Sequence, residues 1–322
     1  MLVKILLSQH NSQTRKRKLK TTEKVKTYSP QGFRAKFLEI DNFKDSLFKS
    51  NSEHFFCLKL EEINQLKFPV PPSKHICHTI LFIISGTHKV KIGFEEYTTQ
   101  SNEIIVIPAS QIFSIDSINT EITGFICQFH PEILIGKYGN REMINDFDFL
   151  KIWGKPDLSF QNNETQFIIQ LLNRLQVEYT ESGVTNLDII QPYLIALLCE
   201  INKNALKTEK TEIAATVLTT KFKELIFDHI KQQHQVNYYA SMLNVSPNHL
   251  NKSIKSVTGK SPTRWIQESI LLEAKYLLYQ TNLSVNEIAA QLGHYDQSYF
   301  SRIFKKSEGI TPIQFRKMID KS

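Results

Sequence analysis

Two groups of polar residues near the C-terminal end of the chain recur at helical spacing. The first group is Asn248, Asn251 and Lys252, and the second is Gln297, Ser298, Ser301 and Arg302. Side chains three or four positions apart lie on one face of a helix, so each group can present its hydrogen-bonding atoms together. An asparagine amide can bond adenine through two atoms, and a lysine can donate to guanine O6 and N7. These groups are therefore candidates for contacts with DNA bases, and Arg302 is the strongest candidate for a base or phosphate contact.

Three lysines stand close to the same groups: Lys255, Lys305 and Lys306. A lysine ammonium on a basic surface contacts phosphate more readily than a base edge. Phosphate contacts set the affinity and the salt dependence of binding, but they carry no sequence information. We therefore expect these lysines to bind the DNA backbone.

One sequence pattern surrounds both polar groups, in residues 238–250 and again in residues 285–300. Each copy is typical of a short helix, a tight turn and a second helix. Asn244 and Gly293 occupy the turns, where a positive φ is needed and Asn or Gly adopts it at low cost. The pattern predicts a helix-turn-helix used twice, with the polar groups on the second helix of each copy.

Capping signals support these helices. Ser246 followed by Pro247 is an N-cap and first-turn pair, and Ser284 with Glu287 is a capping box. The expected buried anchors of the two second helices are Leu250, Ile254, Phe300 and Phe304. A further helix from Pro262 spans roughly 18 residues, about 27 Å. A strut of this length can hold two recognition helices about one DNA turn apart, roughly 34 Å.

The C-terminal third of the chain resembles the AraC-type transcription factors. The run from Ser298 to Lys306, the segment 309–312 (Gly-Ile-Thr-Pro) and Arg316 are similar to that family's C-terminal signature. Residues 243–246 and 258–262 are similar to its first helix-turn-helix. The resemblance covers about residues 217–320 and implies sequence-specific DNA binding, most often to activate transcription. It also implies that Asn248, Asn251 and Lys252 are base-contact positions, and the second group occupies the equivalent face of the second helix.

The region before this is typical of β-structure followed by helices. Residues 79–84 form a continuous apolar run, and residues 88–92 alternate apolar and charged. Further candidate strands are residues 55–60, 95–99, 103–107, 112–116 and 123–129. Short strands at this spacing predict a sandwich or barrel. From about residue 160 the apolar period becomes helical on both sides of Gly183, which predicts a helical hairpin that packs on the barrel or pairs with a second subunit.

Residues 55–130 are similar to the cupin-type sensor domain of many AraC-type regulators. The features that carry this likeness are residues 79–84 with Gly86 and residues 103–108. The resemblance implies a small effector inside the barrel and dimerisation through the following helices. The candidate lining of an effector pocket is Phe82, Ile84, Phe113 and Phe125. For each of these residues, filling the core is the alternative.

An enzyme is the competing hypothesis for this region, as a cupin-type metalloenzyme fused to a DNA-binding module. A metal needs converging nitrogen and oxygen ligands. His75 and His78 are spaced unlike the cupin pair, and Phe113 stands where a metal cupin has a histidine. A DNA-repair methyltransferase would need clustered cysteines, but Cys57, Cys77, Cys127 and Cys199 are scattered. We therefore expect no catalytic residue, no metal site and no cofactor.

Composition and charge are consistent with a two-domain DNA-binding protein. Of the 322 residues, 41% are hydrophobic and 22% charged, and the net charge of +7 comes from basic ends around an acidic middle. The expected division is a basic tail (1–32), a sensor and dimerisation domain (33–202), a linker (203–216) and a DNA-binding domain (217–320). The fold class is α+β, with a cupin-like β-barrel and helical hairpin before an all-α double helix-turn-helix.

The expected partners and location follow from that division. We expect the chain to bind double-stranded DNA as a homodimer, with RNA polymerase as a further partner of an activator and a small effector in the barrel. No apolar run approaches the roughly 18 residues of a membrane span, and the first residues lack the features of a signal peptide. The expected location is therefore the cytoplasm, without a membrane partner.

Overall fold

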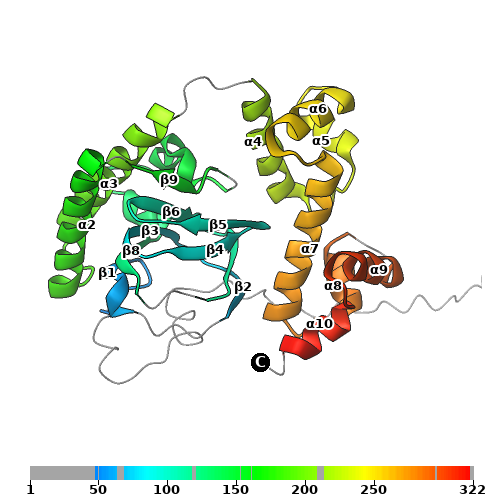
Figure 1. Cartoon of the computed structure of the whole chain (residues 1–322), viewed down its shortest axis with the longest axis horizontal. Helices are drawn as coiled ribbons and strands as arrows, with labels where there is room; N and C mark the ends of the chain where they lie inside the picture. Colours follow the sequence, from blue (N-terminus) through cyan, green and yellow to red (C-terminus); the bar gives the residue numbers. More distant parts are fainter. Residues whose placement is uncertain are drawn as a thin grey trace, which may run out of the picture.

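The computed structural model describes most of the chain after residue 47. The described ranges are 48–49, 51–63, 69–117, 121–152, 154–160, 162–208, 214–293 and 296–319. The expected basic tail, residues 1–32, lies outside them. Within them, an N-terminal β-region is followed by helices, and the last part is entirely helical (Figure 1). This order confirms the predicted α+β fold class, with a β-region before an all-helical C-terminal region.

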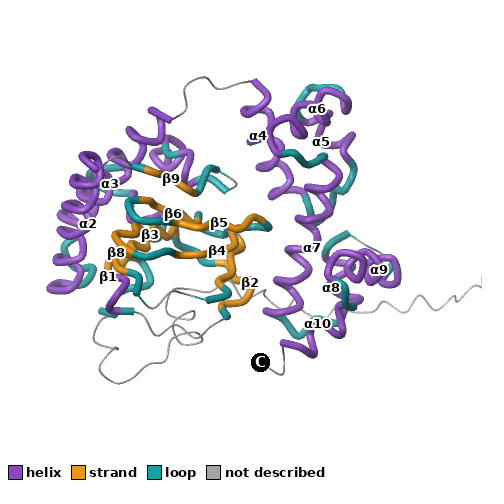
Figure 2. Tube along the Cα trace, in the orientation of Figure 1, coloured by secondary structure: helices purple, strands orange, loops and turns teal. Residues whose placement is uncertain are grey.

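Two antiparallel sheets form the β-region (Figure 2). The strands are β1 Phe55–Lys59, β2 Val70–Lys74, β3 His78–Ser85, β4 His88–Ile92, β5 Glu95–Thr99, β6 Glu103–Ile107, β7 Ile112–Ile115, β8 Thr123–Phe129 and β9 Asp157–Ser159. One sheet has the order β1-β8-β3-β6-β9 and the other the order β2-β7-β4-β5. Along the chain, short 3-10 helices lie between some of these strands: η2 Leu60–Glu62, η3 Pro131–Leu134, η4 Arg141–Asp146 and η5 Asp148–Leu150.

The five-stranded sheet is buried on both faces, which explains the continuous apolar run of β3. Leu81 and Ile83 face the other sheet, and their core also contains Ile105 and Phe113. Ile80 and Phe82 have the opposite parity and belong to the core beneath the helical hairpin. Alternate side chains of a strand point to opposite faces, so one apolar strand supplies two separate cores.

The hairpin consists of α2 Asn162–Ser182 and α3 Leu187–Thr208, and it covers the outer face of the five-stranded sheet (Figure 1). Gly183 has a φ of 63°, and its N–H donates to Tyr179 O at 2.8 Å, which ends α2. Tyr179 and Leu172 are fully buried against the sheet. The hairpin predicted around Gly183 is thus confirmed.

The remaining helices form the C-terminal region. They are α4 Ala214–His229, α5 Val236–Met242, α6 Pro247–Thr258, α7 Pro262–Gln280, α8 Val285–Gln291, α9 Gln297–Glu308 and α10 Pro312–Ile319. Helix α7 is the long central element, with α5 and α6 near its start and α8, α9 and α10 near its end (Figure 1). None of the described helices is long and apolar enough to cross a membrane.

The β-region packs directly on α7. Lys74 Nζ on β2 lies 2.6 Å from Glu273 Oε1, and both side chains are about nine-tenths buried. Gln280 Nε2, at the end of α7, donates to Pro72 O at 2.9 Å. Near the start of α7 the rings of Phe94 and Trp265 meet edge to face, with centroids 4.5 Å apart. The two regions therefore touch at both ends of the strut.

Three features of this arrangement differ from the sequence predictions. Strand β2 contains Pro71 and Pro72, which cannot donate to a ladder, so the sequence had no strand signal there. The three-residue strand β9 was also missed. In the stretch expected as a linker, α3 continues to Thr208 and α4 begins at Ala214, so both ends of 203–216 are helical. The residues between them lie outside the described ranges.

Candidate nucleic-acid interface

The first helix-turn-helix consists of α5 and α6. Asn244 in the turn has a φ of 55°, as the sequence predicted. Ser246 caps α6, because its Oγ accepts the N–H of His249 at 3.2 Å. Leu250 and Ile254 are fully buried, which anchors one face of α6 in the C-terminal core. The opposite face of α6 is therefore left for solvent or a ligand.

The second helix-turn-helix consists of α8 and α9. Ser284 and Glu287 form the predicted capping box at the start of α8. Gly293 has a φ of 72°, and a Cβ at this position would lie 2.9 Å from Lys231 O, so the backbone approach there is very close. The carboxylate of Asp296 caps α9 by accepting the N–H of Ser298 at 2.7 Å. Phe300 and Phe304 anchor α9 as Leu250 and Ile254 anchor α6.

The structure places each predicted polar group on one face of its helix. The exposed members are Asn248, Asn251, Lys252, Gln297, Ser298 and Arg302, and Ser301 is half-buried. Both faces lie opposite the buried anchors, as expected for recognition helices. The lysines expected at phosphates, Lys255, Lys305 and Lys306, are exposed and lie in the last turns of α6 and α9.

One residue of this face was missed by the sequence reasoning. Tyr299 is 50% exposed, and the guanidinium carbon of Arg302 lies 5.9 Å from the centre of its ring. That distance is within the range of a cation–π contact, so Tyr299 orients the side chain with the strongest case for binding DNA. The signal was its position three residues before Arg302, on the same helix face.

Different contacts hold the two units to α7. Trp265 Nε1 donates to Thr258 Oγ1 at 3.0 Å, which joins the start of α7 to the end of α6. At the other end, the guanidinium of Arg316 on α10 donates to the carbonyl oxygens of Leu278, Thr281 and Leu283. The carbonyls of Leu278 and Thr281 lie at the end of α7, where helical bonds cannot reach them, and that of Leu283 lies in the loop before α8. The spacing of the two recognition helices is thereby fixed by rigid elements.

The residues expected to line an effector pocket do not share one cavity. Phe82 and Phe125 are cross-strand partners on the face covered by the hairpin. Ile84 is 40% exposed, and of the four residues only Phe113 belongs to the core between the sheets. The expectation of one pocket was wrong because a continuous apolar run does not reveal which residues share a face.

The histidines considered for a cupin metal site also point apart. The ring of His75 packs on Phe113, in the core between the sheets, at 4.7 Å between centroids. The ring of His78 lies 5.2 Å from that of Phe129, in the core beneath the hairpin, and its Nδ1 accepts the N–H of Ala109. Burial lowers the pKa of His75 to about 3 and that of His78 to about 4, so both are neutral. The pair does not form a converging ligand set.

A polar pair instead lies between the sheets. His88 on β4 and Thr99 on β5 are ladder partners, and His88 shares its face with Val90 and Ile92, which belong to the core between the sheets. Both side chains are buried, and among the described residues neither ring nitrogen of His88 nor Thr99 Oγ1 has a hydrogen-bond partner. Burial lowers the pKa of His88 to about 4. This pair carries polar atoms that a bound molecule could satisfy.

Two helix-turn-helix units joined by one rigid helix, each with an exposed polar face on its second helix, define the C-terminal region as a nucleic-acid-binding domain. Comparison with known proteins agrees, because residues 239–318 match the family model of a helix-turn-helix domain. The C-terminal region is a helix-turn-helix domain of the AraC type. This confirms the resemblance seen in the sequence.

Individual relatives are similar over parts of their length. The chain is 31% identical over 94 residues to YisR, an uncharacterized HTH-type transcriptional regulator of Bacillus subtilis, covering 29% of this chain and 33% of YisR. It is 24% identical over 163 residues to the arabinose operon regulatory protein of Escherichia coli, covering 50% and 54%. The chain thus aligns with a third to about half of these relatives.

Among solved structures, the C-terminal domain of AraT, a response regulator from Geobacillus stearothermophilus, is 32% identical to this chain. The match covers 33% of this chain and 88% of that domain, with a TM-score of 0.32.

Proposed function

We propose that the chain is a sequence-specific DNA-binding regulator of transcription, acting as an activator. The observation that carries this proposal is the presence of two exposed polar recognition faces, on α6 and α9, held by the single helix α7. Helix α7 has 19 residues, so it is about 28 Å long. That length supports the placement of α6 and α9 in successive major grooves on one side of the duplex.

The proposed base contacts are divided between the two helices. Asn248, Asn251 and Lys252 contact bases in one groove, and Gln297, Ser298, Ser301 and Arg302 contact bases in the next. Lys255, Lys305 and Lys306 bind phosphates. In this arrangement α6 and α9 read different sequences, because their polar groups differ.

The N-terminal region is proposed to sense a small effector and to dimerise. A polar effector in the space between the sheets would find partners in His88 and Thr99. The hairpin carries exposed apolar side chains, among them Phe167 at 54% exposure, Val177 at 43% and Tyr193 at 38%. Apolar side chains on a helical hairpin favour pairing with a second copy. We expect Phe167→Asp to shift the sedimentation of the full chain toward the monomer.

The contacts between the β-region and α7 supply a route for control. Lys74 holds Glu273 near the middle of α7, and Phe94 and Pro72 contact its two ends. An effector or a second subunit that shifts the sheet would change how α6 and α9 are presented to DNA. An activator of this kind also contacts RNA polymerase, which is the remaining proposed partner.

Selection of bound fragments from a random pool of duplex DNA tests the proposal with the full chain. We expect enrichment of a site with two half-sites about 10 base pairs apart, bound at least about a thousandfold more tightly than random DNA. The double variant Asn251→Ala/Arg302→Ala should lose this enrichment, while Gln170→Ala on the exposed face of α2 should keep it. Recovery of no common sequence by the wild type would contradict sequence-specific reading.

A further inference from the structure

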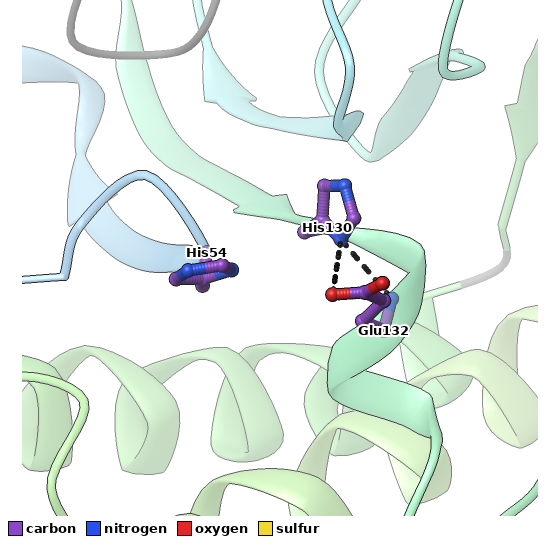
Figure 3. A group of neighbouring side chains, drawn as sticks. All are labelled: His54, His130 and Glu132. Atoms are coloured by element: carbon purple, nitrogen blue, oxygen red, sulfur yellow. Dashed lines mark hydrogen bonds and ion pairs between the residues drawn. The ribbon is translucent and has the colours of Figure 1, made fainter.

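We propose that His54, His130 and Glu132 form a binding site for a divalent transition metal ion of the zinc class. Their potential ligand atoms all lie within 4.8 Å of one another, although His54 is far from the other two in sequence (Figure 3). Two imidazoles and a carboxylate are a ligand set that suits zinc and its neighbours in the first transition row. The site lies at the end of the β-region, away from the recognition helices.

Strand pairing fixes the two histidines opposite each other. Strands β1 and β8 are antiparallel partners, with Phe55 opposite Phe129. The ladder continues by one pair, because the N–H of His130 donates to His54 O at 2.7 Å. The two imidazole rings project to the same side, with centroids 5.8 Å apart and planes nearly perpendicular. The backbone thus brings both rings to one place before any ion binds.

The third ligand comes from the helix that follows β8. Pro131 opens η3, and Glu132 stands in its first turn, so its carboxylate turns back toward His130. His130 Nδ1 lies 3.8 Å from Glu132 Oε2. The same nitrogen accepts the backbone N–H of Glu132 at 3.3 Å, which is a long hydrogen bond. The Nδ1 lone pair is engaged by this N–H, so an ion bound at Nδ1 beside the carboxylate would replace the long hydrogen bond.

Small side-chain movements complete the geometry. Zinc binds nitrogen and oxygen at about 2.0–2.2 Å, so the ligand atoms of a tetrahedral site lie within about 3.5 Å of one another. His54 and Glu132 are exposed and can rotate toward the better fixed ring of His130, which is half-buried. Water would fill the remaining position. The bound ion would then fasten the start of β1 to the end of β8 and to η3.

The site also touches the hairpin through η3. Gln191 on α3 donates from Nε2 to Ile133 O at 3.1 Å, and Ile133 follows Glu132 directly. Metal binding should therefore protect β1, η3 and the neighbouring part of α3 together. That pattern can be measured by hydrogen exchange, apart from any effect on DNA.

The test is a calorimetric titration of the metal-stripped full chain with Zn²⁺, repeated with Co²⁺ to follow its visible absorption. We expect one ion per chain with a dissociation constant in the micromolar range or below. His130→Asn keeps an acceptor for the N–H of Glu132 but removes the imidazole. This variant, His54→Asn and Glu132→Gln should each weaken binding by more than the roughly 10- to 100-fold that loss of an outer-shell partner causes.

Two control variants test whether zinc binds to other exposed side chains of the chain. His249→Asn removes an exposed histidine of α6, and Cys199→Ser removes the exposed thiol of α3. Both should bind zinc like the wild type, and thermal unfolding in the absence of zinc should show that every variant is folded. Wild-type binding that is equally strong in the His54, His130 and Glu132 variants would overturn the proposal, as would the lack of stoichiometric binding by the wild type.

Discussion

The two helix-turn-helix units share a backbone design but not their supports. Helices α6 and α9 each have 12 residues, and each ends at a left-handed glycine, Gly259 or Gly309. The first unit contacts Trp265, which packs on Phe94 of the β-region. The second is tied by Arg316 within the C-terminal region. A signal from the β-region therefore reaches the first unit through the start of α7 and the second unit through the end of α7.

Gly293, in the turn of the second unit, should be more sensitive to substitution than Gly259, at the end of α6 in the first unit. Gly293→Ala places a Cβ 2.9 Å from Lys231 O at a φ of 72°. Left-handed backbone and overlap together should cost about 3 kcal/mol of unfolding free energy, measured by chemical denaturation. Gly259→Ala has the same backbone handedness in open space, so it should cost only about 1 kcal/mol. Equal losses would show that the close approach is not the constraint.

Removing the support of the second unit should have the next largest effect. Arg316→Met leaves up to three carbonyls without a charged donor and should lower the free energy of unfolding by about 2 kcal/mol. Hydrogen exchange should then accelerate in α8 and α9 more than in α5 and α6. Lys317→Met, at an exposed neighbouring position, should stay within about 0.5 kcal/mol of the wild type. Uniform acceleration across both units would contradict separate supports.

Base contacts should distinguish the two units by sequence preference. Arg302→Ala should weaken DNA binding by roughly 10- to 100-fold, the equivalent of about 1–3 kcal/mol, and relax the preference in one half-site. Asn251→Ala should relax the preference in the other. Lys255→Ala should instead weaken binding to all sequences alike and reduce the salt slope by about 1. Competition titrations with half-site mutants would measure these preferences, and a change in the same half-site for both variants would argue against one groove per helix.

The smallest expected effect concerns the contact of Phe94, in the β-region, with Trp265 beside the first unit. Phe94→Ala removes the edge-to-face contact with Trp265, which is worth about 1 kcal/mol. Hydrogen exchange should accelerate in α6 and at the start of α7, and the exchange rates in α9 should be unchanged. Tyr138→Ala, an exposed aromatic of the same region, serves as the control. Equal hydrogen-exchange rates in α6 of the two variants would show that the β-region does not stabilise the first unit.

Sequence reasoning succeeded where the determinants are local. Ser246, Ser284 and Asn244 act on residues within one turn of themselves, so their roles in capping and turning could be predicted. The exposed faces of α6 and α9 followed from helical period alone. These signals fixed most of the C-terminal domain before any tertiary contact was known.

It failed where the determinants are distant in sequence. Phe82 was expected in a pocket, but α2 and α3 cover its face of the sheet, and nothing within β3 indicates that. His54 and His130 meet only because β1 pairs with β8. The spacing of single residues could not have revealed either arrangement, because both depend on strand register and on which elements cover each face.

The double role of α7 has a thermodynamic consequence. This helix carries both recognition units, and the ion pair of Lys74 with Glu273 also joins it to the β-region. Any molecule whose binding to the sheets shifts α7 changes the affinity for DNA by some factor, and linkage requires DNA to change the affinity for that molecule by the same factor. Under the proposed function, a DNA site would itself be a ligand that tunes effector binding, so the chain on its DNA would respond to a different effector concentration from the chain in free solution.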